Sequence, residues 1–350
     1  MAKYRALLLG CGGRGTAHAD AYSDLQDIEL VGVCDMVQER ADAFKTKYNV
    51  PLAFTDYETA LAETKPDIVH VVTCPGNRVW EAEVTAAAGV RAMIVEKPMG
   101  IQPSDVEGLT RVHSETGMEI MQNCQRRYYP QFRDGVIREI VHEKLGDLYF
   151  VRASTSGNTI AMGPHLMDLL QLFLNEAQPN AVWAMAHTIT DESYEATHKA
   201  PQSLFAQYWF PAQENLATDV RVMFDASPDC LGTPGETSFW MHLHFDFLGS
   251  KGRLYLTQNK GYWYQTEGMV EPVHGESSWD TQEPTGQRDF TQGVADWLET
   301  GKPHLNRFAV SSAVISTLLG AQKSVYEGDK VSMPTNFSDQ EWEALRERLR

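Results

Sequence analysis

The sequence predicts an α/β chain. Its first part is a doubly wound parallel sheet, and its second part is an α+β domain with a large, mainly antiparallel open sheet. Up to about residue 125, short apolar runs alternate with segments of helical length, as in parallel strands joined by right-handed crossovers. Beyond that point, strands with period-two alternation follow one another with few helices between them. Since 350 residues suffice for about two domains, we expect one at residues 1–125 and one at residues 126–350.

The apolar runs of the first 125 residues lack alternation, which predicts strands buried on both faces of a parallel sheet. The segments between these runs have the length and polarity of helices. Expected strands cover residues 4–9, 29–34, 67–73, 92–95 and 119–122, and expected helices cover 16–25, 37–47, 56–62, 79–88 and 105–116.

The second half predicts strands at residues 148–155, 181–189, 217–224, 237–248, 253–256 and 261–266. Helices are expected at residues 164–174, 288–300, 309–327 and 339–350, and long loops at 192–218 and 228–236. The clearest alternation covers residues 238–247, where every second residue is apolar. It predicts one face in a core and the other, with Trp240, His242 and His244, in a polar interface, a site or solvent.

Composition narrows the function classes. The chain has 43% hydrophobic and 22% charged residues, which is ordinary for a globular protein, and its formal net charge is −17. That charge repels phosphate backbones and anionic lipid, so we expect neither nucleic acid nor a membrane as a partner. The five cysteines are scattered without a C-x-x-C pair, which predicts reduced thiols and neither a disulfide frame nor a zinc site. With no transmembrane-length apolar run and no secretory leader, we expect a cytoplasmic protein.

A glycine-rich turn follows the first expected strand and reads Gly10-Cys11-Gly12-Gly13-Arg14-Gly15. In this position Gly10 permits the tight turn, Gly12 lets the backbone approach a pyrophosphate, and Gly15 allows close packing of helix on strand. The second strand ends in Asp35, 20 residues after Gly15, where a carboxylate can accept hydrogen bonds from a ribose hydroxyl. The pattern predicts a dinucleotide site of the Rossmann type, with NAD favoured because Asp35 would repel a 2′-phosphate. The alternative for Asp35 is a cap on the next helix, and Arg40, one turn on, keeps NADP open.

Lys97 follows the strand at residues 92–95 within Glu96-Lys97-Pro98, at the carboxyl end where ligands of open α/β sheets bind. A lysine there can hydrogen-bond a hydroxyl during its oxidation and stabilise the developing alkoxide. The alternative is a solvated surface lysine paired with Glu96, and spacing alone favours that alternative.

His165 and Asp168 open an expected helix and lie three residues apart, hence on one face. Leucines 166, 169 and 170 with Phe173 form the opposite, core-facing stripe. A histidine titrates near neutrality, so His165 is a candidate proton carrier, and Asp168 could orient it or bind a substrate hydroxyl. The alternative is a structural histidine beside an acid that favours the helix dipole.

Three weaker signals remain. Asn123 and the pair Arg126 and Arg127 lie where the two halves meet; the arginines could bind cofactor or substrate, or brace the junction, and we favour bracing. His242 and His244 alternate on one strand but lack a third metal ligand, so no metal is expected. Trp240 and Trp263 are candidates for stacking on a substrate ring.

Together these motifs resemble the glucose–fructose oxidoreductase / inositol dehydrogenase / MocA (Gfo/Idh/MocA) family of NAD(P)-dependent oxidoreductases. The resemblance covers nearly the whole chain, and E-K-P followed about 65 residues later by H-x-x-D is its most specific part. The motifs that carry it are LLLGCGGRGTAHADAY, VGVCD, VHVVTCP, VEKPMG, NCQRRYYP, GPHLMDLL, FLGSKGRLYL and the stretch from ADWLETGKP to MP.

The resemblance implies a Rossmann domain followed by an α/β domain whose open sheet often forms a subunit interface, and activity on sugars, inositols or related polyols. By this likeness Lys97 and His165 are catalytic and Asp168 contacts substrate. Trp240 and Arg126 remain substrate-binding candidates. The cofactor-binding set comprises Gly10, Gly12, Gly13, Arg14, Gly15, Asp35, Thr73, Pro75, Asn77, Glu96 and Lys97.

Two positions depart from the family pattern. The family has an additional Asp four residues before the histidine, where this chain has Ala161, and residues 156–163 contain no carboxylate. The family often has a histidine shortly after the T-x-P turn, where this chain has Arg78, which could meet an acidic or phosphorylated group.

The leading hypothesis is an NAD-dependent dehydrogenase acting on a secondary hydroxyl of a sugar, polyol or glycoside, with the substrate between Lys97 and His165. One alternative is an NAD-dependent glycosidase that oxidises a ring carbon transiently. Another is a non-catalytic NAD(H) sensor, which Ala161 favours and the retention of Lys97 and His165 opposes. We expect a homodimer or homotetramer through the second-domain sheet, because a partner would cover its row of Trp240, His242 and His244.

Overall fold

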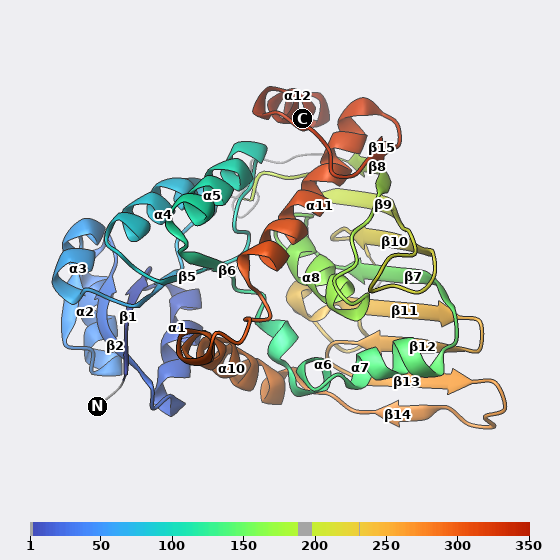
Figure 1. The fold of residues 1–350 in the computed structure, drawn as a ribbon, viewed down its shortest axis with the longest axis horizontal. Helices are drawn as coiled ribbons and strands as arrows, with labels where there is room; N and C mark the ends of the chain where they lie inside the picture. Colours follow the sequence, from blue (N-terminus) through green and yellow to red (C-terminus); the bar gives the residue numbers. More distant parts are fainter. Residues whose placement is uncertain (1–2, 188–197, 231) are drawn as a thin grey trace. The chain divides into compact units, whose positions relative to one another are not determined.

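The computed structural model describes residues 3–187, 198–230 and 232–350. The chain divides into two compact units (Figure 1). The first unit contains Met1–Gly100, Asp105–Tyr128 and Glu283–Ser312. The second contains Ile101–Ser104, Tyr129–Gln282 and Ala313–Arg350. The segment Glu283–Ser312 therefore folds with the first unit, although it lies far along the second half of the sequence. No helix within these described residues has the length and apolar character needed to cross a membrane.

The first unit is built on a six-stranded parallel sheet in the order β3-β2-β1-β4-β5-β6, which confirms the doubly wound prediction. Chain order reverses between β1 and β4, which is where ligands bind at the carboxyl ends of such strands. The strands are β1 Tyr4–Leu9, β2 Ile28–Cys34, β3 Leu52–Phe54, β4 Ile68–Val71, β5 Ala92–Val95 and β6 Glu119–Gln122. The helices between them are α1 Gly13–Asp20, α2 Gln38–Tyr48, α3 Tyr57–Thr64, α4 Arg78–Ala87 and α5 Pro103–Thr116.

A helix from the far end of the chain completes the core of the first unit. Helix α10 (Trp279–Thr300) carries Phe290, Val294 and Ala295, which pack with buried residues of the sheet such as Tyr4 and Ile94. Burying these side chains removes apolar surface from water, at about 25 cal/mol per Å². The apolar side chains of α10 therefore explain why this late segment belongs to the first unit.

The second unit contains a nine-stranded sheet in the order β14-β13-β12-β11-β7-β10-β9-β8-β15, with only the β7–β10 pair parallel among the described strands. Its strands are β7 Leu148–Thr155, β8 Ala181–His187, β9 Ser203–Phe210, β10 Val220–Ala226, β11 Leu243–Gly249, β12 Gly252–Thr257, β13 Gly261–Thr266, β14 Val273–Gly275 and β15 Val331–Ser332. Its helices are α6 Pro130–Arg133, α7 Val136–Glu139, a π-helical turn at Ile140–Lys144, α8 Gly163–Phe173, α11 Phe308–Glu327 and α12 Asp339–Leu349. The mainly antiparallel open sheet was expected.

The strand predicted at residues 237–248 is wrong in its first half. Strand β11 begins only at Leu243, and Phe239–Met241 form a 3₁₀ turn. The register with the neighbouring strand β7 ends at Thr155, opposite Leu243, and beyond it the carbonyl oxygen of His242 accepts from the N–H of Ser156 at 3.1 Å. Trp240 and His242 therefore do not lie on the sheet face.

The long loop predicted at residues 192–218 is also wrong, because strand β9 lies within it between β8 and β10. Its residues alternate between buried and partly exposed positions, with Leu204, Ala206, Tyr208 and Phe210 buried. Residues 188–197 lie outside the described residues, and with them the last two residues of the strand expected at 181–189.

Candidate functional site

The glycine turn connects β1 to α1 and has two tight and two open positions. Gly10 has φ of 102°, and a Cβ there would lie 2.5 Å from the carbonyl oxygen of Val72. A Cβ on Gly15 would lie 2.4 Å from the carbonyl oxygen of Gly10. Gly12 and Gly13 have no atom within 4 Å of such a Cβ. The turn is thus fixed on its inner side and open to a ligand on its outer side.

Asp35 holds the glycine turn against the end of β2. Its carboxylate accepts a hydrogen bond from the backbone N–H of Cys11 at 2.8 Å, on Oδ2. The other oxygen accepts one from the backbone N–H of Val37 at 2.9 Å. Each carboxylate oxygen has a further acceptor site, so Asp35 both caps the following turn and keeps acceptor capacity for a hydroxyl. Met36 beside it is 88% exposed.

Glu96 follows β5 and is a buried charge with several donors. Its Oε1 accepts from Arg14 Nε at 2.6 Å, from Asn123 Nδ2 at 2.8 Å and from His18 Nε2 at 2.9 Å. Burial alone would raise the pKa of Glu96, but the neighbouring Arg14 and the bond from His18 hold it well below its usual range. Glu96 is therefore an ionised carboxylate at the same sheet edge as the glycine turn.

Helix α10 contributes two side chains to this cluster that the sequence analysis missed. Glu283 Oε1 accepts from Arg14 at 3.1 Å and from Gln125 at 2.8 Å. Gln287 and Asn123 exchange two amide hydrogen bonds, of 2.9 and 3.2 Å. Glu283 and Gln287 lie four residues apart in a helix and belong to no motif, so only their shared helix face could have drawn attention to them.

Lys97 is partly buried, and its own backbone N–H donates to Oε2 of Glu96 at 3.1 Å. Burial lowers the pKa of Lys97 to about 8, and the Glu96 carboxylate opposes that shift. This environment differs from that of the solvated surface lysine that spacing alone favours. A lysine with a pKa near the working pH can exchange a proton with a substrate hydroxyl.

The turn after β4 holds Thr73, Pro75 and Asn77, the last two in a short 3₁₀ helix. Arg78 after it has no exposed surface and donates to Thr73 Oγ1 at 2.6 Å and to Glu81 Oε2 at 2.9 Å. The expectation that Arg78 could meet an acidic or phosphorylated ligand is therefore wrong, because its side chain is already engaged by Glu81 within the unit.

Arg126 and Arg127 are buried in a 3₁₀ turn at Gln125–Tyr128. Arg127 donates to the carbonyl oxygen of Leu305 at 3.3 Å, within the first unit. This bond lies inside one unit, so the bracing of the junction between the two halves stays a prediction. The roles of Arg126 toward substrate or cofactor stay predictions.

In the second unit, His165 and Asp168 lie in the first turns of α8 and are 4% and 1% exposed. The expected stripe of leucines is buried, but so is every other residue of α8. The loop before it is organised by Asn158, whose Oδ1 accepts from the N–H groups of Ile160 at 3.1 Å and Ala161 at 2.6 Å. Ala161 is 1% exposed.

Trp240 lies beside that loop, although it is not on the sheet face. Phe239 and Trp240 are 40% and 41% exposed, and their rings meet edge to face at 5.2 Å. A Cβ on Gly157 would lie 3.3 Å from the Phe239 ring, so the aromatic pair borders the turn that leads to His165. Trp240 therefore remains a candidate for stacking on a substrate ring.

His242 and His244, both within the strand predicted at residues 237–248, have hydrogen-bond partners in the second unit. His242 Nδ1 accepts from the backbone N–H of Thr233 at 2.7 Å, and His244 Nε2 contacts Thr233 Oγ1 at 2.6 Å. Burial and the neighbouring His242 lower the pKa of His244 to about 4. In the described parts of the chain, no three His, Cys, Asp or Glu side chains converge as metal ligands.

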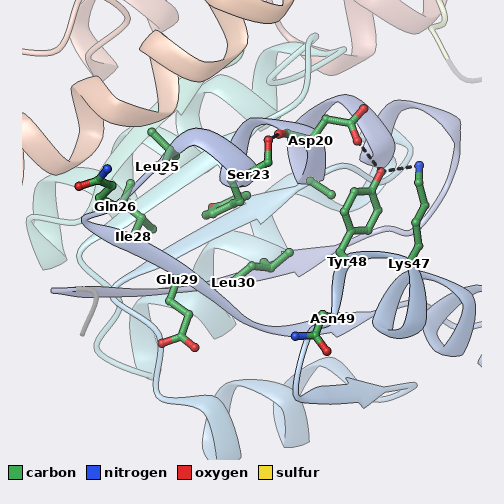
Figure 2. A pocket seen from close by; sticks show the side chains of 12 residues that line it. Asp20, Ser23, Leu25, Gln26, Ile28, Glu29, Leu30, Lys47, Tyr48 and Asn49 are labelled. Carbon is green, nitrogen blue, oxygen red and sulfur yellow. Dashed lines mark hydrogen bonds between the residues drawn. The ribbon is translucent and has the colours of Figure 1, made fainter.

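A surface pocket of about 710 Å³ lies elsewhere in the first unit (Figure 2). It is bordered by the amino-terminal end of β2, including Ile28, and by the end of α2. Tyr48 donates to Asp20 and accepts from Lys47, both at 2.8 Å, across its rim. The glycine turn does not line it, so this pocket is separate from the cluster around Glu96.

The comparisons agree with this geometry. The family model described as "Oxidoreductase family, NAD-binding Rossmann fold" (Gfo/Idh/MocA) matches residues 4–123, which cover the glycine turn, Asp35 and Glu96-Lys97. Over these residues the chain is similar to this family. Inositol 2-dehydrogenase of Rhizobium meliloti is 28% identical over 53% of this chain and 59% of its own length. Glycosyl hydrolase family 109 protein 1 of Akkermansia muciniphila is 26% identical over 43% of this chain and 34% of its own length.

A likeness of fold to solved structures extends over almost the whole chain. A crystal structure of an oxidoreductase from Agrobacterium radiobacter in complex with NAD⁺, L-tartaric acid and magnesium covers 94% of this chain and 98% of its own. The TM-score is 0.76 at 17% sequence identity, a likeness of fold. In sequence, the chain spans less than two thirds of the length of the curated relatives that it matches.

The lowered pKa of Lys97 predicts a stability effect. Below about pH 8 the lysine is charged in the folded and the unfolded chain, so the burial penalty is fully present. Between about pH 8 and 10.5 the folded lysine loses its proton first, and stability should rise with pH. Lys97→Met should therefore raise the free energy of unfolding at pH 7 by about 1–2 kcal/mol, and the gain should vanish above pH 10.5.

The measurement is urea unfolding of both proteins from pH 6.5 to 10.5. Lys45→Met, at a solvent-exposed position on α2, is the matched control and should give no such pH-dependent gain. A Lys97→Met protein that is less stable than wild type at pH 7 would contradict the assignment of Lys97 as a penalised buried charge.

Proposed function

We propose that this protein is an NAD-dependent dehydrogenase that oxidises a secondary hydroxyl of a sugar, polyol or glycoside. The observation that carries the proposal is Lys97, whose pKa is lowered to about 8 beside an ionised Glu96. Both follow β5, whose carboxyl end shares one sheet edge with the glycine turn after β1. A proton-exchanging amine beside a dinucleotide turn is suited to alcohol oxidation.

The residues present fit a dinucleotide. Gly12 and Gly13 leave the outer side of the turn open, while Gly10 and Gly15 have no room for a Cβ. The amino end of α1 offers N–H groups and a positive dipole end to a pyrophosphate, and Asp35 keeps acceptor capacity for ribose hydroxyls. When bound, NAD⁺ supplies the hydride acceptor.

The chain's own residues handle the proton. Oxidation breaks the C–H and O–H bonds of the alcohol and forms a carbonyl: the hydride leaves from carbon and the proton from oxygen. Lys97 holds the hydroxyl oxygen and stabilises its developing negative charge, and His165 accepts the proton. Asp168, one helical turn from His165, binds a second substrate hydroxyl or orients the imidazole. We assign the proton transfer to His165 because residue 161 is alanine and residues 156–163 contain no carboxylate.

One relative favours a second function. The similarity to a family 109 glycosyl hydrolase supports an NAD-dependent glycosidase that oxidises a ring carbon, eliminates the aglycone and then returns the hydride. The same residues would serve, but cofactor would not be consumed. Turnover of an aryl glycoside by protein carrying NAD, without added cofactor and without net NADH, would select this function over the dehydrogenase.

The cofactor preference should follow from Asp35. We expect NAD(H) to bind at least about tenfold more tightly than NADP(H), because the carboxylate would repel a 2′-phosphate. Asp35→Ser should narrow the preference mainly by improving NADP binding. Calorimetry with all four cofactor forms tests this, and equal affinities in the wild-type protein would contradict it.

If Lys97 and His165 are catalytic, replacing either one should lower the turnover number. Lys97→Ala and His165→Ala should each lower kcat by about 10²–10⁴-fold, and NAD affinity should change little in His165→Ala. The pH profile of kcat/KM should rise through an ionisation near that of histidine, since the base must be neutral. Steady-state kinetics on a substrate found by screening sugars, inositols, uronic acids and glycosides for NADH production provide the test. Near wild-type turnover in both variants would show that the assignment is wrong.

The second-unit sheet supports a proposal of self-association. On the sheet face opposite buried Leu204 and Tyr208, Met185 of β8 pairs with Phe205 of β9, and Met185 is 55% exposed. Trp209 lies on the same face of β9, beyond Gln207. We therefore propose these apolar side chains as the interface, in place of the predicted row of Trp240, His242 and His244. A second copy of the chain fits it, because a sheet face can be self-complementary.

Light scattering should therefore give a multiple of 39.3 kDa at micromolar concentration. Met185→Glu combined with Phe205→Glu should lower the mass toward one chain by placing charges in the interface. A wild-type mass of one chain would refute the proposal.

A further inference from the structure

Two histidines of the first unit are fully buried and have no part in the proposed reaction. His18 lies in α1, three residues after the glycine turn, and His70 lies in β4. Both have no exposed surface, and their Nδ1 atoms are 2.8 Å apart. Their rings meet edge to face, with centroids 5.1 Å apart. A contact between two ring nitrogens requires one to donate and the other to accept, so each ring has a defined proton position.

The proton positions follow from the ionised Glu96. A carboxylate oxygen can only accept, so Nε2 of His18, at 2.9 Å from Glu96 Oε1, carries a hydrogen. Burial lowers the pKa of both histidines, which favours the neutral form of each ring. Nδ1 of His18 is then an acceptor, and Nδ1 of His70 donates to it. Nε2 of His70 is left as an acceptor, with no hydrogen-bond partner among the residues that the structure describes.

Glu96 fixes the hydrogen on Nε2 of His18, and the bond from His70 occupies the remaining lone pair on Nδ1. If His18 took the other tautomer, its Nε2 lone pair would point at the carboxylate, and two donors would face each other at Nδ1. His18, Arg14 and Asn123 donate to the same oxygen of Glu96, and the other oxygen receives the N–H of Lys97. The histidine pair thus acts on Lys97 through Glu96.

We propose that His18 and His70 are positioning residues: a neutral, tautomer-fixed imidazole pair that holds the Glu96 carboxylate in place and thereby sets the position and charge of Lys97. The inference rests on the proposed function in one respect, namely that Lys97 acts on substrate. It assigns no contact with substrate or cofactor to either histidine.

Packing alone does not account for the pair. Apolar side chains of similar volume would fill this space without desolvating four ring nitrogens, and buried polar groups are costly unless they are hydrogen-bonded. The charged and titratable groups around His18 are Glu96, Arg14, Glu283 and His70. Those around Lys97 are Glu96, Arg14, Arg126 and Cys124. Glu96 and Arg14 are shared, and only Glu96 bonds both His18 and the Lys97 backbone.

Matched variants separate the hydrogen bond from the volume. His70→Asn places an amide N–H near the position of Nδ1, whereas His70→Leu has a similar size and no donor. His18→Gln places an amide N–H near the position of Nε2, whereas His18→Met has similar length and no donor. Circular dichroism and thermal unfolding establish that each variant is folded.

The first readout needs no substrate. Nitrogen-15 NMR of histidine-labelled protein, with and without NAD, should show His18 neutral with hydrogen on Nε2 and His70 neutral with hydrogen on Nδ1. The reverse tautomers, or a charged ring at pH 7, would overturn the proposal even if Leu and Met variants failed to fold.

The second readout is the pKa of Lys97, obtained from competitive acylation of its amine between pH 6 and 11 with detection by mass spectrometry. His70→Leu and His18→Met should raise it by about half a unit or more, because Glu96 loses a donor and its charge acts more strongly on the lysine. His70→Asn and His18→Gln should stay close to wild type. Equal pKa values of Lys97 in all folded variants would show that the two histidines contribute only to packing.

Kinetics on an identified substrate complete the test. The Leu and Met variants should lose about tenfold or more in kcat with NAD affinity unchanged, and the Asn and Gln variants should recover most of it. If Lys97→Ala itself retains turnover, the proposed function fails. The tautomer and acylation results would still decide the role of the histidines.

Discussion

The first unit's candidate site depends on one buried negative charge, the carboxylate of Glu96. An unpaired charge at this depth would be strongly destabilising, so the surrounding segments must supply donors. Arg14 and His18 both lie in α1, Asn123 follows β6, and all three donate to the same oxygen. Because these donors come from opposite ends of the sheet's sequence, the requirement to stabilise one charge fixes α1 relative to the end of β6. Lys97 follows Glu96 directly and is placed with it.

The same requirement explains the polar face of α10. Its apolar residues, such as Phe290, pack in the core of the first unit. One helical turn earlier, Gln287 pairs with Asn123, and Glu283 shares Arg14 with Glu96. Arg14 thus lies between two carboxylates, which raise its pKa although burial lowers it. A helix from late in the chain completes both the apolar core and the charge balance around the glycine turn.

Much of the first unit could be predicted because its signals are local. Unalternating apolar runs, the glycine turn and Asp35 at the end of β2 each depend on a few neighbouring residues, and the parallel order follows from their succession. The three-residue strand β3 was missed because so short a run gives no periodicity. Glu283, His18 and His70 could not be predicted for a different reason. Their hydrogen bonds form only when segments far apart in the sequence come together, and no spacing in the sequence indicates those contacts.

The second unit shows how period-two patterns mislead in both directions. Alternation continues through Phe239 and Met241, but the strand begins at Leu243 because β7 ends opposite it. Residues 203–210, expected in a loop, form strand β9 although their sequence SLFAQYWF does not alternate; only their burial does. An alternating sequence therefore shows only that one face of a segment could be buried. A strand forms where a neighbouring strand supplies hydrogen-bond partners. His165 and Asp168 could be found from their motif alone, while their burial depends on the helix being covered on all sides.

The turn before α8 explains why a carboxylate would be poorly placed at residue 161. Asn158 accepts from the N–H groups of Ile160 and Ala161, and this closes a tight turn whose side chains are buried. An acid at position 161 would bring a charge into a region where the nearby side chains Ile160 and Met162 are apolar and equally buried. Such a group would be protonated or would reopen the turn. The pKa of Lys97, near 8, results from the balance between its own burial and the fixed charge of Glu96.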